Sequence, residues 1–342
     1  MKLVSYVTDG SAPRDAGRGG VLLGNDIFDL ETLIRWAARN GTALSPAGNL
    51  SGPPVTVLDL LRLGPIAMDE VRHAASIAQH APPNDLKLQP GLVYDLGAVP
   101  LRAPIPNPPV IRDFYTFEQH VKAARARRGA EMNPDWYKLP VFYFSNTSEV
   151  YGPDEAIPYP QQSQEVDFEL EIACVIGREG KNISADDAAD FIAGYFIMND
   201  WSARDLWRKE QSLNMGPAKG KDFATSLGPW LVTSDELADF RTGSGKTERL
   251  NLSMTARING DMLSTDNATN MYYGFPQLVE QASMHVRLRP GDVIGSGTCG
   301  TGCILELGTE RHRWLQPGDT VELAIEHLGL LRNTIAEPQK QK

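Results

Sequence analysis

The chain has 342 residues, a length that suits two domains or one large domain with an appendage. Hydrophobic residues make up 42% and charged residues 22% of it, a globular composition that excludes a disordered chain. The formal net charge of −10 disfavours binding to nucleic acid or to an anionic membrane surface, because both require Lys and Arg.

The first hundred residues predict a small α+β domain with short strands. The segments 2–7, 20–25 and 26–30 end at or surround turn residues and are predicted to be strands. Apolar residues at helical spacing predict helices at 31–40, 56–63 and 69–80. The chain turns polar by Thr8, so we expect no signal peptide, and no apolar run reaches the roughly 18 residues of a membrane helix.

A proline-dense stretch follows this domain. Prolines crowd the segment 100–109, where the chain must be extended and non-helical. We interpret this stretch as a linker. It divides the chain into a small domain at 1–103 and a larger domain at 104–342.

Strand patterns dominate the larger domain. The segment 168–177 predicts a strand that carries Glu at alternate positions, and 251–258 predicts a strand that ends in the hairpin dipeptide Asn259-Gly260. Pro-Gly-Asp turns at 290–292 and 317–319 each lead into a strand. The larger domain is therefore predicted to be mostly β, as a barrel or a sandwich-like roll.

Glu169 and Glu171 are the first candidates for a functional site. Residues two apart on a strand point to the same face, so these carboxylates repel each other unless a cation lies between them. The alternative is an ordinary solvated face of an exposed strand, since glutamates are mostly exposed.

Two further acids and a histidine are placed near predicted strand ends. Asp200 follows the apolar run 194–198 and can line a pocket, although an acid there can also cap a helix. Asp113 and His120 are seven residues apart, about two helical turns, so they can share one side of a helix. A lone histidine is nevertheless more often structural than catalytic.

A glycine-rich loop at 295–302 allows the backbone to approach a ligand closely. The loop lacks the Lys of a phosphate-binding loop and does not match a dinucleotide fingerprint. Cys299 and Cys303 in and beside this loop are interpreted as small buried side chains. Three cysteines in all are too few for a disulfide scaffold, so we expect a cytoplasmic protein in a reducing compartment.

Together these segments resemble the fumarylacetoacetate hydrolase family, over about residues 111–335. The resemblance rests on motifs in the family's order and spacing, namely Asp113-Phe114-Tyr115 with His120, Asp167-Phe168-Glu169-Leu170-Glu171, 199–205, 220–223 before 226–230, and 295–298 with Glu306. It implies a mixed β-roll catalytic domain that forms a homodimer. It also implies that the N-terminal hundred residues form a small SH3-like domain.

The resemblance further implies a metal site. Asp113, Glu169, Glu171 and Asp200 match the family's metal-binding carboxylates. Ligation by oxygen alone suits Mg²⁺, which we expect, and also Mn²⁺ or Ca²⁺, but does not suit Zn²⁺. A cation there also removes the repulsion within the Glu-x-Glu strand.

His120, Glu306 and Lys221 match the family's catalytic positions. The first two match the pair that activates water in the carbon–carbon hydrolases, where the carboxylate holds the imidazole in the tautomer that accepts a proton. Lys221 matches a lysine whose charge stabilises a developing oxyanion.

Other matching positions contact the substrate. Tyr115, Tyr143 and Thr298 match such positions, and 125–129 matches a mobile cover with an arginine, which is not identified among the three arginines here. Trp207 stands where the family often has glutamine. An indole in place of an amide changes the shape and polarity of the pocket and points away from fumarylacetoacetate itself.

The resemblance therefore implies a metal-dependent hydrolase of ketonic carbon–carbon bonds, in the catabolism of aromatic compounds. Its substrate would be a small anionic acid, an acylpyruvate- or fumarylacetoacetate-like 2,4-dioxo acid. Water activated by His120 and Glu306 would attack the metal-chelated substrate.

Two alternatives remain open. The first is a 2-oxo acid decarboxylase or isomerase, of the oxaloacetate decarboxylase or 2-hydroxyhepta-2,4-diene-1,7-dioate isomerase type, which uses the same metal enolate without attack by water. The second is a non-catalytic binding protein with a residual family fold. The full set of ligand and dyad candidates argues against this second alternative.

Overall fold

The N-terminal part of the protein combines an antiparallel sheet with packed helices, as the sequence predicts. The computed structural model describes residues 1–40, 54–127 and 129–338. The strands are β1 (Lys2–Tyr6), β2 (Arg18–Leu23), β3 (Asp26–Asp29) and β4 (Val93–Asp95). The helices are α1 (Leu30–Arg39), α2 (Val57–Leu63), α3 (Pro65–His80) and α4 (Pro83–Lys87).

Local capping residues set where these helices begin. Asp29 accepts a hydrogen bond from the N–H of Thr32 at the start of α1, and Thr56 forms a capping box at the start of α2. The helix predicted at 69–80 begins earlier, at Pro65. Gly64 ends α2, and a proline fits the first turn of the next helix because its missing N–H needs no partner there.

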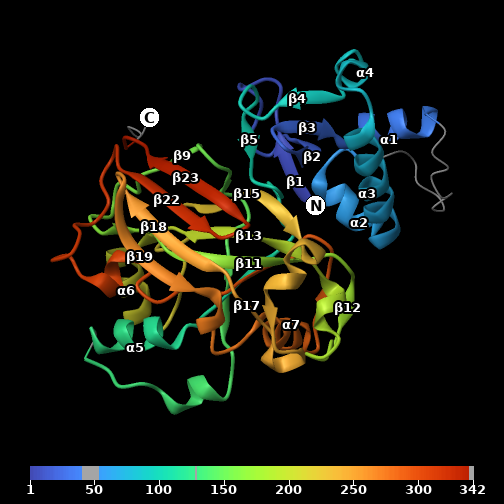
Figure 1. Cartoon of the computed structure of the whole chain (residues 1–342). Helices are drawn as coiled ribbons and strands as arrows, with labels where there is room; N and C mark the ends of the chain where they lie inside the picture. The colour runs from blue at the N-terminus through green and yellow to red at the C-terminus, as the bar shows by residue number, and fades with distance from the viewer. Residues whose placement is uncertain (41–53, 128, 339–342) are drawn as a thin grey trace.

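One large sheet runs through both halves of the chain (Figure 1). Leu3 of β1 pairs with Leu231 of β15 (Thr225–Thr233), and the strand order is β4-β3-β2-β1-β15-β13-β11-β21-β6-β7. The proline stretch contains β5 (Leu101–Arg102), which pairs with β1. The predicted linker at 100–109 therefore contains a short strand of the same sheet, and this sheet joins the N-terminal part to the larger part. The domain division at residue 103 and the SH3-like character of the N-terminal part stay predictions.

The central strands of this sheet have no solvated face. They are β6 (Ile111–Phe114), β11 (Leu170–Ile176), β13 (Ile192–Asp200) and β21 (Val293–Gly295), whereas β7 (Phe142–Ser145) lies at the edge of the sheet and exposes Phe144. On β11, Ile172 and Cys174 belong to one apolar core, whereas Ala173 and Val175 belong to the core shared with the N-terminal helices. The interpretation of the Glu-x-Glu strand as an exposed strand is therefore wrong.

A second sheet packs against the large one and encloses the main core (Figure 1). Its order is β19 (Asp261–Asn267), β18 (Ser253–Ile258), β22 (Thr320–Ile325), β23 (Gly329–Ile335) and β9 (Ala156–Ile157). The predicted hairpin between β18 and β19 is confirmed. Asn259 and Gly260 both have positive φ, 53° and 90°, as a two-residue turn of this type needs.

Shorter elements complete the β-rich part, whose mixed α+β architecture is the predicted one. The helices are α5 (Glu118–Ala126), α6 (Arg204–Ser212), α7 (Phe275–Ser283) and α8 (Ile304–Leu307). Short strands are β8 (Val150–Tyr151), β10 (Val166–Asp167), β12 (Gly180–Lys181), β14 (Ser202–Ala203), β16 (Arg241–Thr242), β17 (Arg249–Leu250) and β20 (Arg287–Leu288). The 3₁₀ turns are η1 (Pro134–Tyr137), η2 (Ala188–Phe191), η3 (Ser234–Phe240), η4 (Gly245–Thr247) and η5 (Ala268–Asn270).

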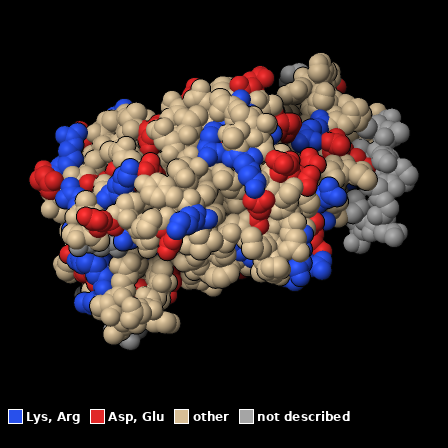
Figure 2. Space-filling view, turned by 90° about the horizontal axis from the view of Figure 1, so that it is seen from below, with Lys and Arg blue, Asp and Glu red and all other residues tan. Residues whose placement is uncertain are grey.

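The surface carries charges of both signs. Figure 2 shows Lys and Arg interspersed with Asp and Glu over one face of the molecule. Among the helices that the structure describes, none combines the length and apolar character needed to cross a membrane.

Candidate active site

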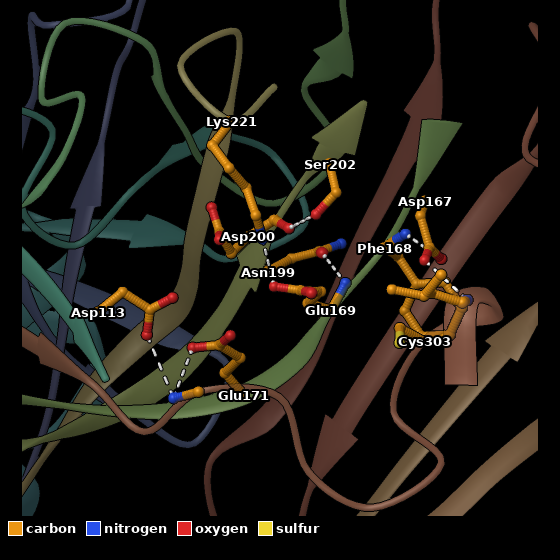
Figure 3. Close-up of polar contacts among 12 residues, drawn as sticks. Asp113, Asp167, Phe168, Glu169, Glu171, Asn199, Asp200, Ser202, Lys221 and Cys303 are labelled. Carbon is orange, nitrogen blue, oxygen red and sulfur yellow. Dashed lines mark hydrogen bonds and ion pairs between the residues drawn. The ribbon is translucent and has the colours of Figure 1, made fainter. Parts of the chain in front are cut away.

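Four buried carboxylates converge at the strand ends of the large sheet. Asp113 comes from β6, Glu171 from β11 and Asp200 from the end of β13, while Glu169 directly precedes β11 (Figure 3). One oxygen of each lies within 4.8 Å of the others, and none of the four residues is more than 5% exposed. The structure thus brings together all the carboxylates proposed from the sequence as metal ligands.

The order of the strands explains how Asp113 reaches this cluster. β21 lies between β6 and β11, and its residue beside Asp113 is Gly295. A Cβ atom at Gly295 would lie 2.5 Å from Oδ1 of Asp113. The absence of a side chain at Gly295 therefore leaves the space that the Asp113 carboxylate occupies beside Glu171.

The electrostatics of the cluster are those of crowded, desolvated acids. Burial and the nearby Asp200 raise the pKa of Asp113 to about 7. Burial and the carboxylates of Asp113 and Glu169 raise the pKa of Glu171 well above its usual value. Burial would also raise the pKa of Glu169, but Lys221 and Arg204 outweigh it and hold that pKa at about 2.

The donor set fits a hard divalent cation. Oε1 of Glu171 and Oδ1 of Asp200 are buried and have no hydrogen-bond partner among the described residues. Unpartnered buried carboxylate oxygens are costly, and a cation surrounded by oxygen ligands would satisfy them and offset the mutual repulsion of the acids. The second oxygen of Glu171 accepts a hydrogen bond from the N–H of Gly297 at 3.2 Å, and the same N–H also donates to Oδ1 of Asp113 at 3.2 Å.

Lys221 and Tyr143 border the carboxylates. Nζ of Lys221 lies 2.5 Å from Oε2 of Glu169 and 2.5 Å from Oδ2 of Asp200. The hydroxyl of Tyr143 donates to Oδ2 of Asp113 at 2.9 Å and also contacts Asp200. Both side chains therefore hold the acids in place and present a donor group to the same space.

His120 and Glu306 form a buried pair beside the cluster. Nδ1 of His120 on α5 is 2.9 Å from Oε2 of Glu306 on α8. Because a carboxylate accepts at Nδ1, the imidazole keeps its proton on that atom and leaves Nε2 as an acceptor. The prediction that Asp113 and His120 share one side of a helix is wrong. Asp113 lies on β6, which pairs with β21 and β7, and α5, which carries His120, begins only at Glu118.

A cavity of about 310 Å³ opens over these groups. Its walls include Tyr115, Thr298 and Trp207, three of the residues proposed from the sequence to contact substrate, together with the apolar side chains of Phe142 and Leu305. All the predicted site residues line it except two, Asp200 and Glu306, which lie behind the lining. Asp200 is bonded to Lys221 and Tyr143, and Glu306 to His120.

The predicted cover at 125–129 contributes two arginines whose surroundings differ. Arg125 lines the cavity, and its Nε donates to the carbonyl of Glu131. Nε of Arg127 instead donates to the carbonyl of Glu306 at 3.0 Å. Residue 128 lies outside the described residues. Of the arginines that are described there, Arg125 is the one that lines the cavity.

Arg204 and Asp167 belong to the site although sequence reasoning assigned them no role. Arg204 lines the cavity, and its guanidinium is within 2.7 Å of Asp167 and 2.8 Å of Glu169. Both residues lie within motifs that carry the family resemblance, and this position is the signal in the sequence from which their role could have been found. Their pairing was hidden because α6 is otherwise polar, and only the fold shows that Arg204 is 1% exposed.

Comparisons with known proteins show the family to which the chain belongs. The family model for the C-terminal domain of fumarylacetoacetate (FAA) hydrolase matches residues 109–336. The mitochondrial oxaloacetate tautomerase fahd2 of Xenopus laevis is 31% identical over 306 residues, which cover 87% of this chain and 86% of that protein.

Solved structures share the fold. Maleylpyruvate hydrolase from Sphingobium sp. SYK-6, in complex with manganese(II) ion and pyruvate, superposes with a TM-score of 0.66 at 22% identity, over 99% of this chain and 100% of that one. 2-Hydroxyhepta-2,4-diene-1,7-dioate isomerase from Mycobacterium marinum superposes with a TM-score of 0.63 at 23% identity, over 100% of both chains. This chain belongs to the fumarylacetoacetate hydrolase family.

Proposed function

We propose that the protein is a metal-dependent hydrolase that cleaves a carbon–carbon bond in a 2,4-dioxo acid. The observation that carries this proposal is the buried pair of His120 and Glu306, with Nδ1 and Oε2 2.9 Å apart. His120 lines the same cavity as three of the four clustered carboxylates, and the fourth, Asp200, lies just behind its wall. A binding protein without catalysis would have no need of a buried imidazole whose tautomer is controlled in this way.

Asp113, Glu169, Glu171 and Asp200 would hold the divalent cation, which we propose to be Mg²⁺. The manganese and pyruvate in the structure of maleylpyruvate hydrolase support a cation that binds beside a small 2-oxo acid. When bound, the cation supplies Lewis-acid polarisation of the oxygens of the 2-oxo acid. Mn²⁺, which prefers the same oxygen ligands, is the practical substitute in binding experiments.

The residues of the chain would then activate water and balance charge. Nε2 of His120 takes a proton from water, and the hydroxide adds to the distal carbonyl of the substrate. The bond from that carbonyl carbon to the methylene carbon breaks, and its electron pair passes into the enolate of the 2-oxo acid. Lys221 stabilises the negative charge, and the proton that Nε2 of His120 took from water passes to the methylene carbon, which gives a 2-oxo acid beside a carboxylic acid and restores the neutral imidazole.

A second candidate function is supported by the relatives. The tautomerase of Xenopus laevis interconverts forms of oxaloacetate, as its name states, and covers most of this chain. In such a reaction His120 would move a proton between carbon and oxygen of the substrate, and no water would attack. The cavity of about 310 Å³ is larger than a four-carbon acid requires, which favours a substrate with a longer acyl tail.

The deciding experiment measures both reactions on one enzyme preparation. Acylpyruvates of increasing tail length are assayed for loss of the dioxo chromophore and for release of the carboxylic acid, and oxaloacetate is assayed for enol–keto conversion and for loss of carbon dioxide. Cleavage of an acylpyruvate that requires Mg²⁺ supports the hydrolase. Tautomerisation or decarboxylation of oxaloacetate without cleavage of any dioxo acid refutes it in favour of the second candidate.

Two related expectations stay predictions. The homodimer rests on the family resemblance and the cytoplasmic location on the small number of cysteines, and the relative named above is a mitochondrial protein. The molar mass of the protein in solution tests the first of them.

A further inference from the structure

A buried carboxylate outside the metal cluster holds the start of the helix that carries Glu306. Asp167 is fully buried, and its Oδ1 accepts from the N–H of Ile304 at 2.8 Å while its Oδ2 accepts from the N–H of Leu305 at 3.0 Å. These are the first two N–H groups of α8, a helix of four residues that cannot satisfy them internally. In Figure 3, Asp167 lies beside Cys303 at the beginning of this helix, away from Asp113 and Glu171.

Asp167 is also connected to the metal cluster. Nε of Arg204 donates to Oδ2 of Asp167 at 2.8 Å, and Nη2 of the same guanidinium is 2.8 Å from Oε1 of Glu169. Arg204 is 1% exposed, so water does not replace these contacts. A continuous series of polar contacts therefore runs from Glu169 through Arg204 and Asp167 to the backbone of α8.

The other contacts that restrain the backbone of Glu306 are weaker, and its carboxylate also accepts from Nε2 of Gln119 at 3.3 Å. The N–H of Glu306 donates to Sγ of Cys303 at 3.4 Å, and its carbonyl accepts from Nε of Arg127 at 3.0 Å. Sulfur is a poor acceptor, and Arg127 is partly exposed on the cover segment. Glu306 is the third residue of α8, so the direction of its carboxylate follows the orientation of a helix whose first two donors are both bound by Asp167.

We propose that Asp167 is a positioning residue for the general base. Through the backbone of α8 it keeps Oε2 of Glu306 in line with Nδ1 of His120, and through Arg204 it keeps this pair in a fixed relation to Glu169. The inference rests on the proposed role of His120 and Glu306 in activating water. It assigns Asp167 no contact with substrate or metal.

The test compares Asp167→Asn with a matched control, Asp29→Asn. The asparagine amide retains one acceptor but cannot accept from Leu305 N–H with its nitrogen, and it loses the charge that faces Arg204. Asp29 is a 1% exposed acid that also caps a helix and binds an arginine, Arg18, but it lies outside the cavity. The control therefore loses the same kinds of contact without any connection to Glu306.

Two measurements distinguish positioning from general loss of stability. With the dioxo acid that is cleaved fastest, kcat of Asp167→Asn should fall about 10- to 100-fold, part of the contribution of a general base, while KM and the Kd for Mn²⁺ change little. The proton NMR resonance of Nδ1–H of His120, identified by its loss in His120→Ala, should move upfield in Asp167→Asn. Asp29→Asn should change neither kcat nor the resonance.

The outcomes separate this inference from the proposed function. If Asp167→Asn retains the kcat and the resonance of the parent, or if it loses affinity for Mn²⁺ instead of kcat, the inference is wrong. If the parent cleaves no dioxo acid but the resonance still moves in Asp167→Asn and not in Asp29→Asn, the positioning of the pair is supported and the hydrolase proposal is refuted.

Discussion

Replacing Glu171 by Gln should make the metal-free protein more stable and the metal-bound protein less so. Glu171 is fully buried, one of its oxygens has no hydrogen-bond partner among the described residues, and three further carboxylates lie within 4.8 Å of its ligand oxygen. Glutamine has nearly the same shape and keeps an acceptor for the N–H of Gly297, but it carries no charge.

The magnitude follows from Coulomb's law. Two unit charges 4.8 Å apart repel by about 3.5 kcal/mol at an effective dielectric constant of about 20. The ammonium group of Lys221 and proton sharing among the acids reduce this repulsion in the folded protein. We therefore expect Glu171→Gln to raise the unfolding free energy of the metal-free protein by about 1–3 kcal/mol. A neutral amide is a poor ligand for a hard cation, so the Kd for Mn²⁺ should rise at least about tenfold.

Thermal unfolding in chelator and in saturating Mn²⁺, with calorimetric titration of Mn²⁺, measures both effects. The melting temperature in chelator should rise by several degrees, and the further rise on adding Mn²⁺ should shrink. Glu179→Gln is the matched control, because Glu179 is exposed, pairs with Arg287 and lies outside the cavity. A lower melting temperature in chelator together with an unchanged Mn²⁺ titration would refute the reasoning.

Three further predictions test the dyad, the packing of the cavity wall and the pH dependence of folding. His120→Ala should lose about 10²- to 10⁴-fold in kcat for cleavage and keep the Kd for Mn²⁺, and unchanged turnover would contradict the assignment of the base. Gly220→Ala places a Cβ 2.6 Å from Cβ of Trp207, so it should lower the unfolding free energy by about 1–3 kcal/mol and also lower kcat/KM. Gly10→Ala, whose Cβ would have a single neighbouring atom at 3.8 Å, should change neither quantity. Denaturant unfolding and steady-state assays measure the two effects. Burial would raise the pKa of Asp29, but its hydrogen bonds outweigh burial and lower the pKa below the usual value. The ionised carboxylate therefore stabilises the fold by about 1–2 kcal/mol near neutral pH. The unfolding free energies of the parent and of Asp29→Asn should converge as pH falls below about 4.

Short-range patterns predicted the local structure well. The alternation of Glu169 and Glu171 depends only on the two-residue period of an extended chain, and the structure brings both to one cavity although Glu169 lies just before β11. The hairpin at Asn259 and Gly260 depends only on the two φ angles of its turn. The family motifs implied functional roles for residues that are far apart in the chain. The resemblance itself is confirmed by the family match.

What the sequence by itself determined is therefore the set of elements and the chemical groups that they carry. Tertiary structure decided which groups meet. Asp113 reaches Glu171 because β21 lies between β6 and β11 and has a glycine, Gly295, beside Asp113. The order of these strands is not a property of any one segment. Asp167 and Arg204 meet for the same reason, since β10 and β14 pair side by side before Arg204 opens α6. Contacts of this kind depend on the packing of the whole chain, because burial and strand order are set by the two apolar cores together and not by local spacing.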